Sequence, residues 1–157
     1  MAAEEKDSTP PIRKATHTLA GGPGTALAHK EGLPFPYTPL FNGTLAHRLG
    51  FDDSNFRGSL HLGASILPVP FAMCEYRGGS GPDFLTAMVA GYEIGCQIGE
   101  ALGFTAYDLG FYPTAIAGVF GATAAGAKIL GFNPSKIESA PSLKIGQAAG
   151  SMQYLDN

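Results

Sequence analysis

Apolar residues recur every three or four positions over much of this chain, and that spacing predicts helices. The clearest segment is 80–103, where Ser80 is a candidate N-cap and Gly103 follows the last turn. The residues that we assign to its buried face are Leu85, Met88, Val89, Tyr92, Cys96 and Gly99. Strand-like alternation never lasts more than a few residues, so the predicted fold class is all-α.

Caps and helix-breaking residues predict the remaining helices. Asn42 is expected to cap a short helix that ends near Gly50, Pro68 and Pro70 to bend or delay the next one, and Gly131 to close a third. The predicted segments are 42–50, 63–77, 114–130, a helix opening at 133–134, and a weaker apolar face over 142–155. Residues 113–130 are nearly uncharged, but their Ala, Gly and Thr content and the lack of an aromatic belt favour a core helix over a membrane span.

Glycine is frequent inside these predicted helices, although each one costs roughly 1 kcal/mol relative to alanine in an exposed helix interior. The residues concerned are Gly91, Gly95, Gly99, Gly118, Gly121 and Gly126. Close approach of helix axes would offset this cost, because the absent side chain lets a neighbour pack tightly. We therefore predict a compact Gly/Ala-rich bundle over residues 21–157, preceded by a disordered tail over residues 1–20.

Composition excludes several functional classes. A net charge of −3 and a pI near 5.7, without a basic stretch interleaved with aromatics, argue against nucleic acid as a partner. Cys74 and Cys96 lack CxxC spacing and Cys/His partners, so we expect free thiols and no metal site. No Gly-Lys-Ser/Thr follows the glycines at 21–24, so no nucleotide cofactor is predicted. The polar, acidic N-terminus predicts a cytoplasmic protein rather than a secreted or mitochondrial one.

The candidate chemistry gathers in one polar stretch, residues 42–68, between two predicted helices. Its polar residues are His47, Arg48, Asp52, Asp53, Ser54, Asn55, Arg57 and His61. A loop held between two helices is a usual place for a binding or catalytic site.

Three ordered segments carry a family resemblance: NGTLAHRLGFDD (42–53) followed by His61, AGYEIG (90–95), and PTAIAGVFGATAAGAKILG (113–131). Together they resemble the MmgE/PrpD family, which contains 2-methylcitrate dehydratase, cis-aconitate decarboxylase and an iminodisuccinate epimerase. The likeness covers about residues 20–155. It implies an all-helical large domain that forms dimers, a smaller α+β lid domain after it, and a pocket for di- and tricarboxylates.

The resemblance also implies site residues. His61 matches the family's loop histidine, Ser54 a hydroxyl residue that is usually threonine, and Asp52 and Asp53 the preceding acidic pair. Tyr112 stands where the family tends to place a histidine, and a phenol is a poor substitute for imidazole at neutral pH. These five are the candidate catalytic residues.

Arg48, Arg57 and Asn55 are the candidate substrate-binding residues, because the reaction needs cations or donors that hold carboxylates. Structural roles remain as alternatives for four of the candidate catalytic residues. His61 could be hydrogen-bonded to backbone, Asp52 and Asp53 could cap helices or bind the two arginines, and Ser54 could be a local cap. The remaining histidines, His17, His29 and His47, are structural or unassigned.

The departures from the family pattern concern residues expected to take part in the reaction. Gly50 replaces an acid that often precedes Phe-Asp-Asp, and the chain ends at Asn157, before the segment that carries the family's active-site lysine and before the lid. Pro141 and Lys144 interrupt a helix that is usually apolar. One hypothesis is a hydro-lyase of the 2-methylcitrate dehydratase type that acts on a small di- or tricarboxylate. It would be weak or inactive as an isolated chain and completed by a separately encoded C-terminal half, with decarboxylase or epimerase activity as related options. The other is a non-catalytic helical module that dimerises with itself or with an intact paralogue.

Overall fold

The computed structural model describes residues 11–12, 14–15, 18, 21–30 and 32–152. Most of the predicted tail, residues 1–20, lies outside them. The all-α prediction is confirmed, since the described residues form helices and only isolated β-bridges. The α-helices are α2 (Thr38–His47), α3 (Gly63–Ile66), α4 (Pro68–Arg77), α5 (Gly81–Leu102), α6 (Thr105–Asp108), α7 (Pro113–Ile129) and α8 (Pro134–Lys144), and the 3-10 helices are η1 (Phe35–Tyr37) and η2 (Ile145–Gln147).

Local signals explain where the longer helices begin and end. Ser80 and Asp83 form a capping box at the start of α5, each satisfying a backbone N–H of the other. The Asn133 side chain accepts from the Lys136 N–H and caps α8. Gly78 ends α4 in the left-handed conformation that glycine adopts at no steric cost. These boundaries agree with the sequence predictions.

Two predicted helices were wrong in their limits. The first begins at Thr38 rather than Asn42, because Pro39 occupies its first turn, where a missing N–H is tolerated. Asn42 is therefore no cap: it is buried in α2, where its side chain donates to the Thr25 carbonyl and accepts from the Leu27 N–H, both at 2.9 Å. The expected helical face over 142–155 is also wrong, since α8 gives way to η2 and then to an extended segment that bridges Ser151 to Phe111.

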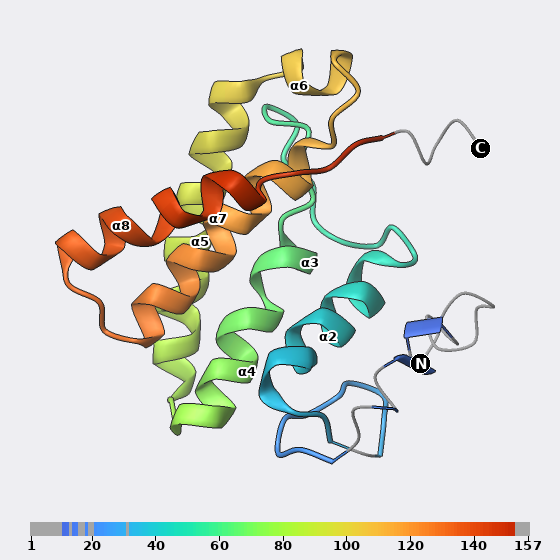
Figure 1. The fold of residues 1–157 in the computed structure, drawn as a ribbon, viewed down its shortest axis with the longest axis vertical. Coiled ribbons are helices and arrows are strands. Elements are labelled where there is room, and N and C mark those ends of the chain that lie inside the picture. The colour runs from blue at the N-terminus through green and yellow to red at the C-terminus, as the bar shows by residue number, and fades with distance from the viewer. Residues whose placement is uncertain (1–10, 13, 16–17, 19–20, 31, 153–157) are drawn as a thin grey trace.

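Helices α5 and α7 form the centre of the fold (Figure 1) and pack along each other, with α4 and α8 against α7 and α2 beside α4. A Cβ on Gly91 would lie 2.9 Å from the Gly121 carbonyl oxygen, and one on Gly121 would lie 2.8 Å from the Gly91 oxygen. The two helices thus meet backbone to backbone, as the internal glycines predicted. No helix in the described part of the chain is long and apolar enough to cross a membrane.

The predicted buried face of α5 was partly wrong. Leu85 and Val89 are 54% and 56% exposed. The residues that α5 buries are instead small ones: Ala87, Gly91, Gly95 and Gly99. Hydrophobicity assigned the large side chains to the core, but the buried side of α5 lies against the Gly121 backbone of α7 and against Leu60 and Leu62, which leave room only for residues with little or no side chain.

The core also receives side chains from the polar stretch. Leu60 and Leu62 are buried, and Leu60 occupies the space that a Cβ on Gly99 would take while Leu62 lies against Gly95. Ile66 of α3 is fully buried between α5 and α7, against Gly91 and Gly121. The end of the polar stretch is thereby fixed to the helical core, which gives the preceding turn a rigid support.

Candidate functional site

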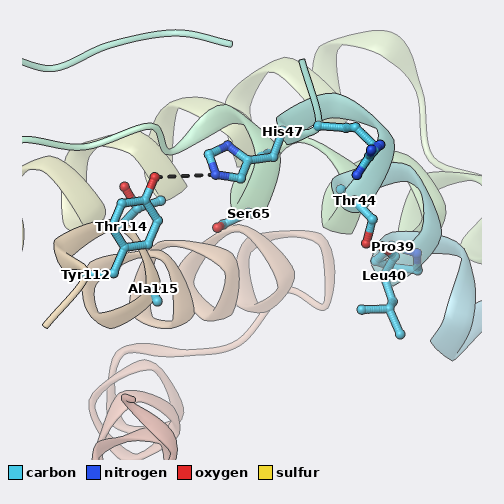
Figure 2. A pocket seen from close by; sticks show the side chains of 11 residues that line it. Pro39, Leu40, Thr44, His47, Ser65, Tyr112, Thr114 and Ala115 are labelled. Carbon is cyan, nitrogen blue, oxygen red and sulfur yellow. Dashed lines mark hydrogen bonds between the residues drawn. The ribbon is translucent and has the colours of Figure 1, made fainter. Parts of the chain in front are cut away.

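A pocket of about 590 Å³ lies between the end of α2, the start of α3 and the start of α7. Figure 2 shows the residues around it. Its polar lining comprises Thr44, His47, Arg48, Ser65, Tyr112 and Thr114, and the rest is Pro39, Leu40, Gly43, Ala64 and Ala115. It is mostly apolar with a few convergent polar groups, which is typical of sites for small molecules.

A chain of three side chains runs along one wall of the pocket. The Tyr112 hydroxyl lies 3.3 Å from His47 Nε2 (Figure 2), and His47 Nδ1 lies 2.6 Å from Asp52 Oδ2. His47 is the last residue of α2, and Tyr112 is the residue before α7. The end of one helix and the beginning of another therefore hold the two rings next to each other, with their planes tilted by 42° and their centroids 6.1 Å apart.

His61 lies beside this chain and is not among the residues that line the pocket. Its Nδ1 lies 2.9 Å from the Asp53 carbonyl oxygen and 3.4 Å from Ser54 Oγ, and its ring centroid is 6.1 Å from that of His47. A carbonyl only accepts, so Nδ1 is the donor and Nε2 is the acceptor of the neutral ring. The His61 backbone N–H donates to Thr114 Oγ1 at 2.9 Å, which ties the turn to α7.

The two aspartates do different things. Asp52 has a side chain only 6% exposed, and its Oδ1 lies 3.8 Å from His61 Nδ1, so one carboxylate stands between two imidazoles. Asp53 Oδ1 accepts from the Gly63 N–H at 2.7 Å, at the first residue of α3, and from the Tyr92 hydroxyl. Burial, followed by the negative charge of Asp53, raises the pKa of Tyr92. Asp53 therefore supports the turn, whereas Asp52 holds His47, which lines the pocket.

The three candidate substrate-binding residues separate in the structure. Arg48 lines the pocket, and its Nε is buried without a hydrogen-bond partner among the described residues. Arg57 is exposed, away from the pocket, with its guanidinium 3.9 Å from a Glu100 carboxylate oxygen. Asn55 is used within the turn, where it accepts from the Gly58 N–H and donates to Cys96 Sγ.

Sequence reasoning gave no role to four polar residues of the pocket: Thr44, His47, Ser65 and Thr114. For His47, a histidine five residues before an aspartate across a Gly-containing turn was a usable signal. Thr114 lies in one of the three family segments, but neither it nor Ser65 was singled out, and only the packing of α3 against α7 brings the two together.

No group of three or more histidine, cysteine, aspartate or glutamate side chains is arranged to bind a metal within the described part of the chain. Cys74 and Cys96 are both free thiols, and burial raises the pKa of each. A raised pKa keeps a thiol protonated and weakly nucleophilic, so neither is an activated cysteine.

The model of the MmgE/PrpD N-terminal domain matches residues 1–157. The chain belongs to the MmgE/PrpD family. The resemblance drawn from the three sequence segments is thereby confirmed.

Curated relatives in this family include a cis-aconitate decarboxylase-like protein, oryM, from Aspergillus oryzae, which is 33% identical over 121 residues. A cis-aconitate decarboxylase from Aspergillus terreus is 30% identical over 119 residues. Each alignment covers 72% of this chain but only 25% and 24% of the respective relative. The chain thus spans about a quarter of the length of these curated relatives.

Proposed function

We propose that this chain forms the helical part of a lyase site for a small di- or tricarboxylate. The observation that carries the proposal is a pocket lined by Arg48 and by the His47–Tyr112 pair, with Asp52 bonded to the other nitrogen of His47. A guanidinium holds a carboxylate with strong charge-assisted hydrogen bonds, and a hydroxyl joined to an imidazole transfers protons. Both groups are needed for bond cleavage next to a carboxylate.

The reaction that we propose first is decarboxylation of cis-aconitate, because both curated relatives described above carry that activity or likeness in their names. Dehydration of 2-methylcitrate, which the sequence predicted first, is the second reaction to assay. Both substrates present several carboxylates on a short carbon chain, so the same pocket residues could bind either of them. A cytoplasmic location stays a prediction from the N-terminal composition.

Binding tests the proposal without requiring turnover. Isothermal titration of the 157-residue chain with tricarballylate, a saturated tricarboxylate, should give a one-site isotherm that weakens at least about tenfold in Arg48→Gln, since a charge-assisted hydrogen bond contributes on the order of 1.5–3 kcal/mol. Arg57→Gln is the matched control, because that guanidinium is exposed and lies outside the pocket. Equal weakening by both substitutions, or no binding at all, would contradict the proposal.

Turnover should be weak in this chain alone. Arg48 is the one cationic side chain, arginine or lysine, that lines the pocket among the described residues, and a tricarboxylate carries three negative charges. We therefore expect slow release of CO2 from cis-aconitate, and a marked increase when segments covering the rest of a full-length relative are supplied. Fast turnover by the chain alone would contradict this part of the proposal.

A second candidate function is a non-catalytic module that dimerises with itself or with a longer paralogue. The observation in its favour is the exposed apolar pair on α5, Leu85 and Val89, one turn apart. Light scattering of the wild-type chain and of Val89→Asp tests it. A dimer that the substitution dissociates supports the module, and a monomer in both chains that also fails to bind a full-length relative excludes it.

A further inference from the structure

The pocket is lined by four residues with a hydroxyl group, Thr44, Ser65, Tyr112 and Thr114, and the Tyr112 hydroxyl lies within hydrogen-bond distance of an imidazole nitrogen. We infer that Tyr112 is the residue that delivers a proton to the substrate in this pocket and that His47, held by Asp52, positions and reprotonates it. This inference rests on the proposed function and assigns roles within the same site. His47 had no assigned role from the sequence, and Tyr112 was expected to be a weak replacement for an imidazole.

The direction of the hydrogen bonds follows from Asp52. Its side chain is almost completely buried, and an ionised carboxylate only accepts, so His47 Nδ1 carries the hydrogen in the 2.6 Å contact. The neutral ring then presents a bare Nε2 toward Tyr112, whose O–H donates to it. In serine proteases, a buried aspartate sets the tautomer of the catalytic histidine in the same way.

The geometry leaves Tyr112 able to turn toward a ligand. The 3.3 Å separation between its oxygen and His47 Nε2 is longer than the usual hydrogen bond, and such contacts often tighten only when substrate is bound. Among the four pocket hydroxyls, the phenol is by far the most acidic, since the ordinary pKa of tyrosine is about 10, well below that of an alcohol. Tyr112 is therefore the best proton donor of the four.

His47 and Tyr112 can supply the one proton that decarboxylation needs. In decarboxylation the bond between the reacting carbon and one carboxylate breaks, CO2 leaves, and the electron pair stays on the carbon. That carbon takes the proton of the Tyr112 O–H. His47, whose side chain is 45% exposed, then takes a proton from solvent at its bare Nε2 and passes it to the phenolate oxygen, which returns the ring to its neutral form. Each turnover consumes one solvent proton and releases one CO2, and no other reactant is required.

His61 fits this role less well. It is absent from the pocket lining, and its Nδ1–H is engaged by the Asp53 carbonyl. The Tyr112 hydroxyl lies 3.3 Å from His47 Nε2 instead, and the two ring centroids are 6.1 Å apart. The nearby Asp52 carboxylate favours His47 as well, at 2.6 Å against 3.8 Å for His61.

Histidine nitrogen NMR tests the hydrogen-bond chain in the protein as it stands, whether or not it turns over substrate. With 15N-labelled histidine, and His47 assigned from His47→Gln, we expect the Nδ1–H tautomer for His47. Tyr112→Phe should move the Nε2 resonance toward that of an unbonded ring nitrogen, and Asp52→Asn should favour the opposite tautomer, because an amide donates to Nδ1. Tyr107→Phe, on α6 and outside the pocket, is the control that leaves both resonances in place. An Nε2–H tautomer in the wild type, or an Nε2 resonance that Tyr112→Phe does not move, overturns the inference.

Kinetics then separate a proton donor from a merely structural residue. Tyr112→Phe should lower kcat for cis-aconitate about a hundredfold or more while KM changes less than about threefold, since general acid catalysis commonly contributes that much to the rate. Tyr112→His should restore part of kcat, because an imidazole again offers a proton at the same place. An unchanged kcat, or a raised KM with unchanged kcat, overturns the donor role. A chain that neither binds tricarballylate nor releases CO2 refutes the proposed function, and the nitrogen resonances still decide whether the relay exists.

Discussion

The helical core and the polar turn are held together by opposite means. In the core, α5 and α7 come close because Gly91 and Gly121 have no side chains, so each backbone fills the space that the other leaves. In the turn, Asp52, His47 and Tyr112 hold one another through side-chain hydrogen bonds. The difference suggests that the core tolerates almost no added volume, whereas the turn depends on the identity of its polar groups. Single substitutions can separate these two kinds of sensitivity.

Leu60 joins the two regions and should give the largest effect on stability. Its buried side chain fills the space beside Gly58 and Gly99, and its backbone pairs with Asn55 across the turn. Leu60→Ala should lower the free energy of unfolding by about 2–5 kcal/mol, the range for buried leucines that leave a cavity. Leu109→Ala, at a leucine that is 69% exposed, is the control and should change it by less than about 0.5 kcal/mol. Urea denaturation of the two variants makes the comparison.

A double-mutant cycle sharpens this result. A Cβ on Gly99 would clash with Leu60 Cδ1, so Gly99→Ala alone should be destabilising. In the Leu60→Ala background the same methyl group enters the cavity and should be tolerated. The coupling between the two sites should therefore be favourable and larger than about 0.5 kcal/mol, the limit for independent positions. Additive effects would show that Leu60 does not fill this space.

Gly121 tests the core alone. Gly121→Ala places a Cβ 2.8 Å from the Gly91 carbonyl oxygen and 2.7 Å from Ile66 Cδ1, and backbone cannot yield as a flexible side chain can. We expect a loss of about 1–3 kcal/mol, as for other overpacked cores. Gly81→Ala is the matched control, because no atom lies within 4 Å of the added Cβ at this helical position. A Gly121→Ala protein as stable as Gly81→Ala in thermal melts would refute backbone-to-backbone packing.

The fold was largely predictable from the sequence, for identifiable reasons. Local signals such as the Ser80 capping box and Gly78 act within a few residues, so the sequence displays them directly. The helix of Thr38–His47 was misplaced because Asn42 was assigned as its cap, although Pro39 lies in the first turn. The side of α5 that is buried could not be predicted from hydrophobicity, since the α7 backbone, Leu60 and Leu62 leave room there only for glycine and alanine.

The site was predictable only in part, because it depends on contacts between distant segments. The polar stretch was recognised, and Arg48 and Tyr112 both line the pocket. His47 was missed, since its partner Tyr112 is 65 residues away and only the meeting of α2 with α7 places them together. The role predicted for His61 remains a prediction, and the structure places that side chain outside the lining.

The pH dependence of stability tests the surroundings of Tyr92, which lies between the helical core and the polar turn. Its pKa is raised, mainly by burial and then by Asp53, so the folded state keeps the phenol protonated at pH values where the unfolded chain ionises. Fewer protons are then bound in the unfolded state, and stability should fall as pH rises above about 10, the ordinary tyrosine value. The slope from this residue is below about 1.4 kcal/mol per pH unit, since the ring is partly exposed. Tyr92→Phe should flatten the fall in denaturation curves measured between pH 9 and 11, and an unchanged slope would show that Asp53 and burial do not act on this hydroxyl.

A pair of serines gives the smallest expected effects. Ser80 accepts from the Asp83 N–H in the capping box of α5, so Ser80→Ala should cost about 1 kcal/mol, as for other lost N-caps. Ser54 Oγ lies 3.4 Å from His61 Nδ1, which already donates to the Asp53 carbonyl at 2.9 Å. Ser54→Ala should therefore change stability by less than about 0.5 kcal/mol, because the exposed hydroxyl is a secondary partner of that ring. If Ser54→Ala were instead the more costly of the two in urea denaturation, the polar turn would depend on more than the Asp52–His47–Tyr112 chain, and Ser54 would have to be counted among its supports.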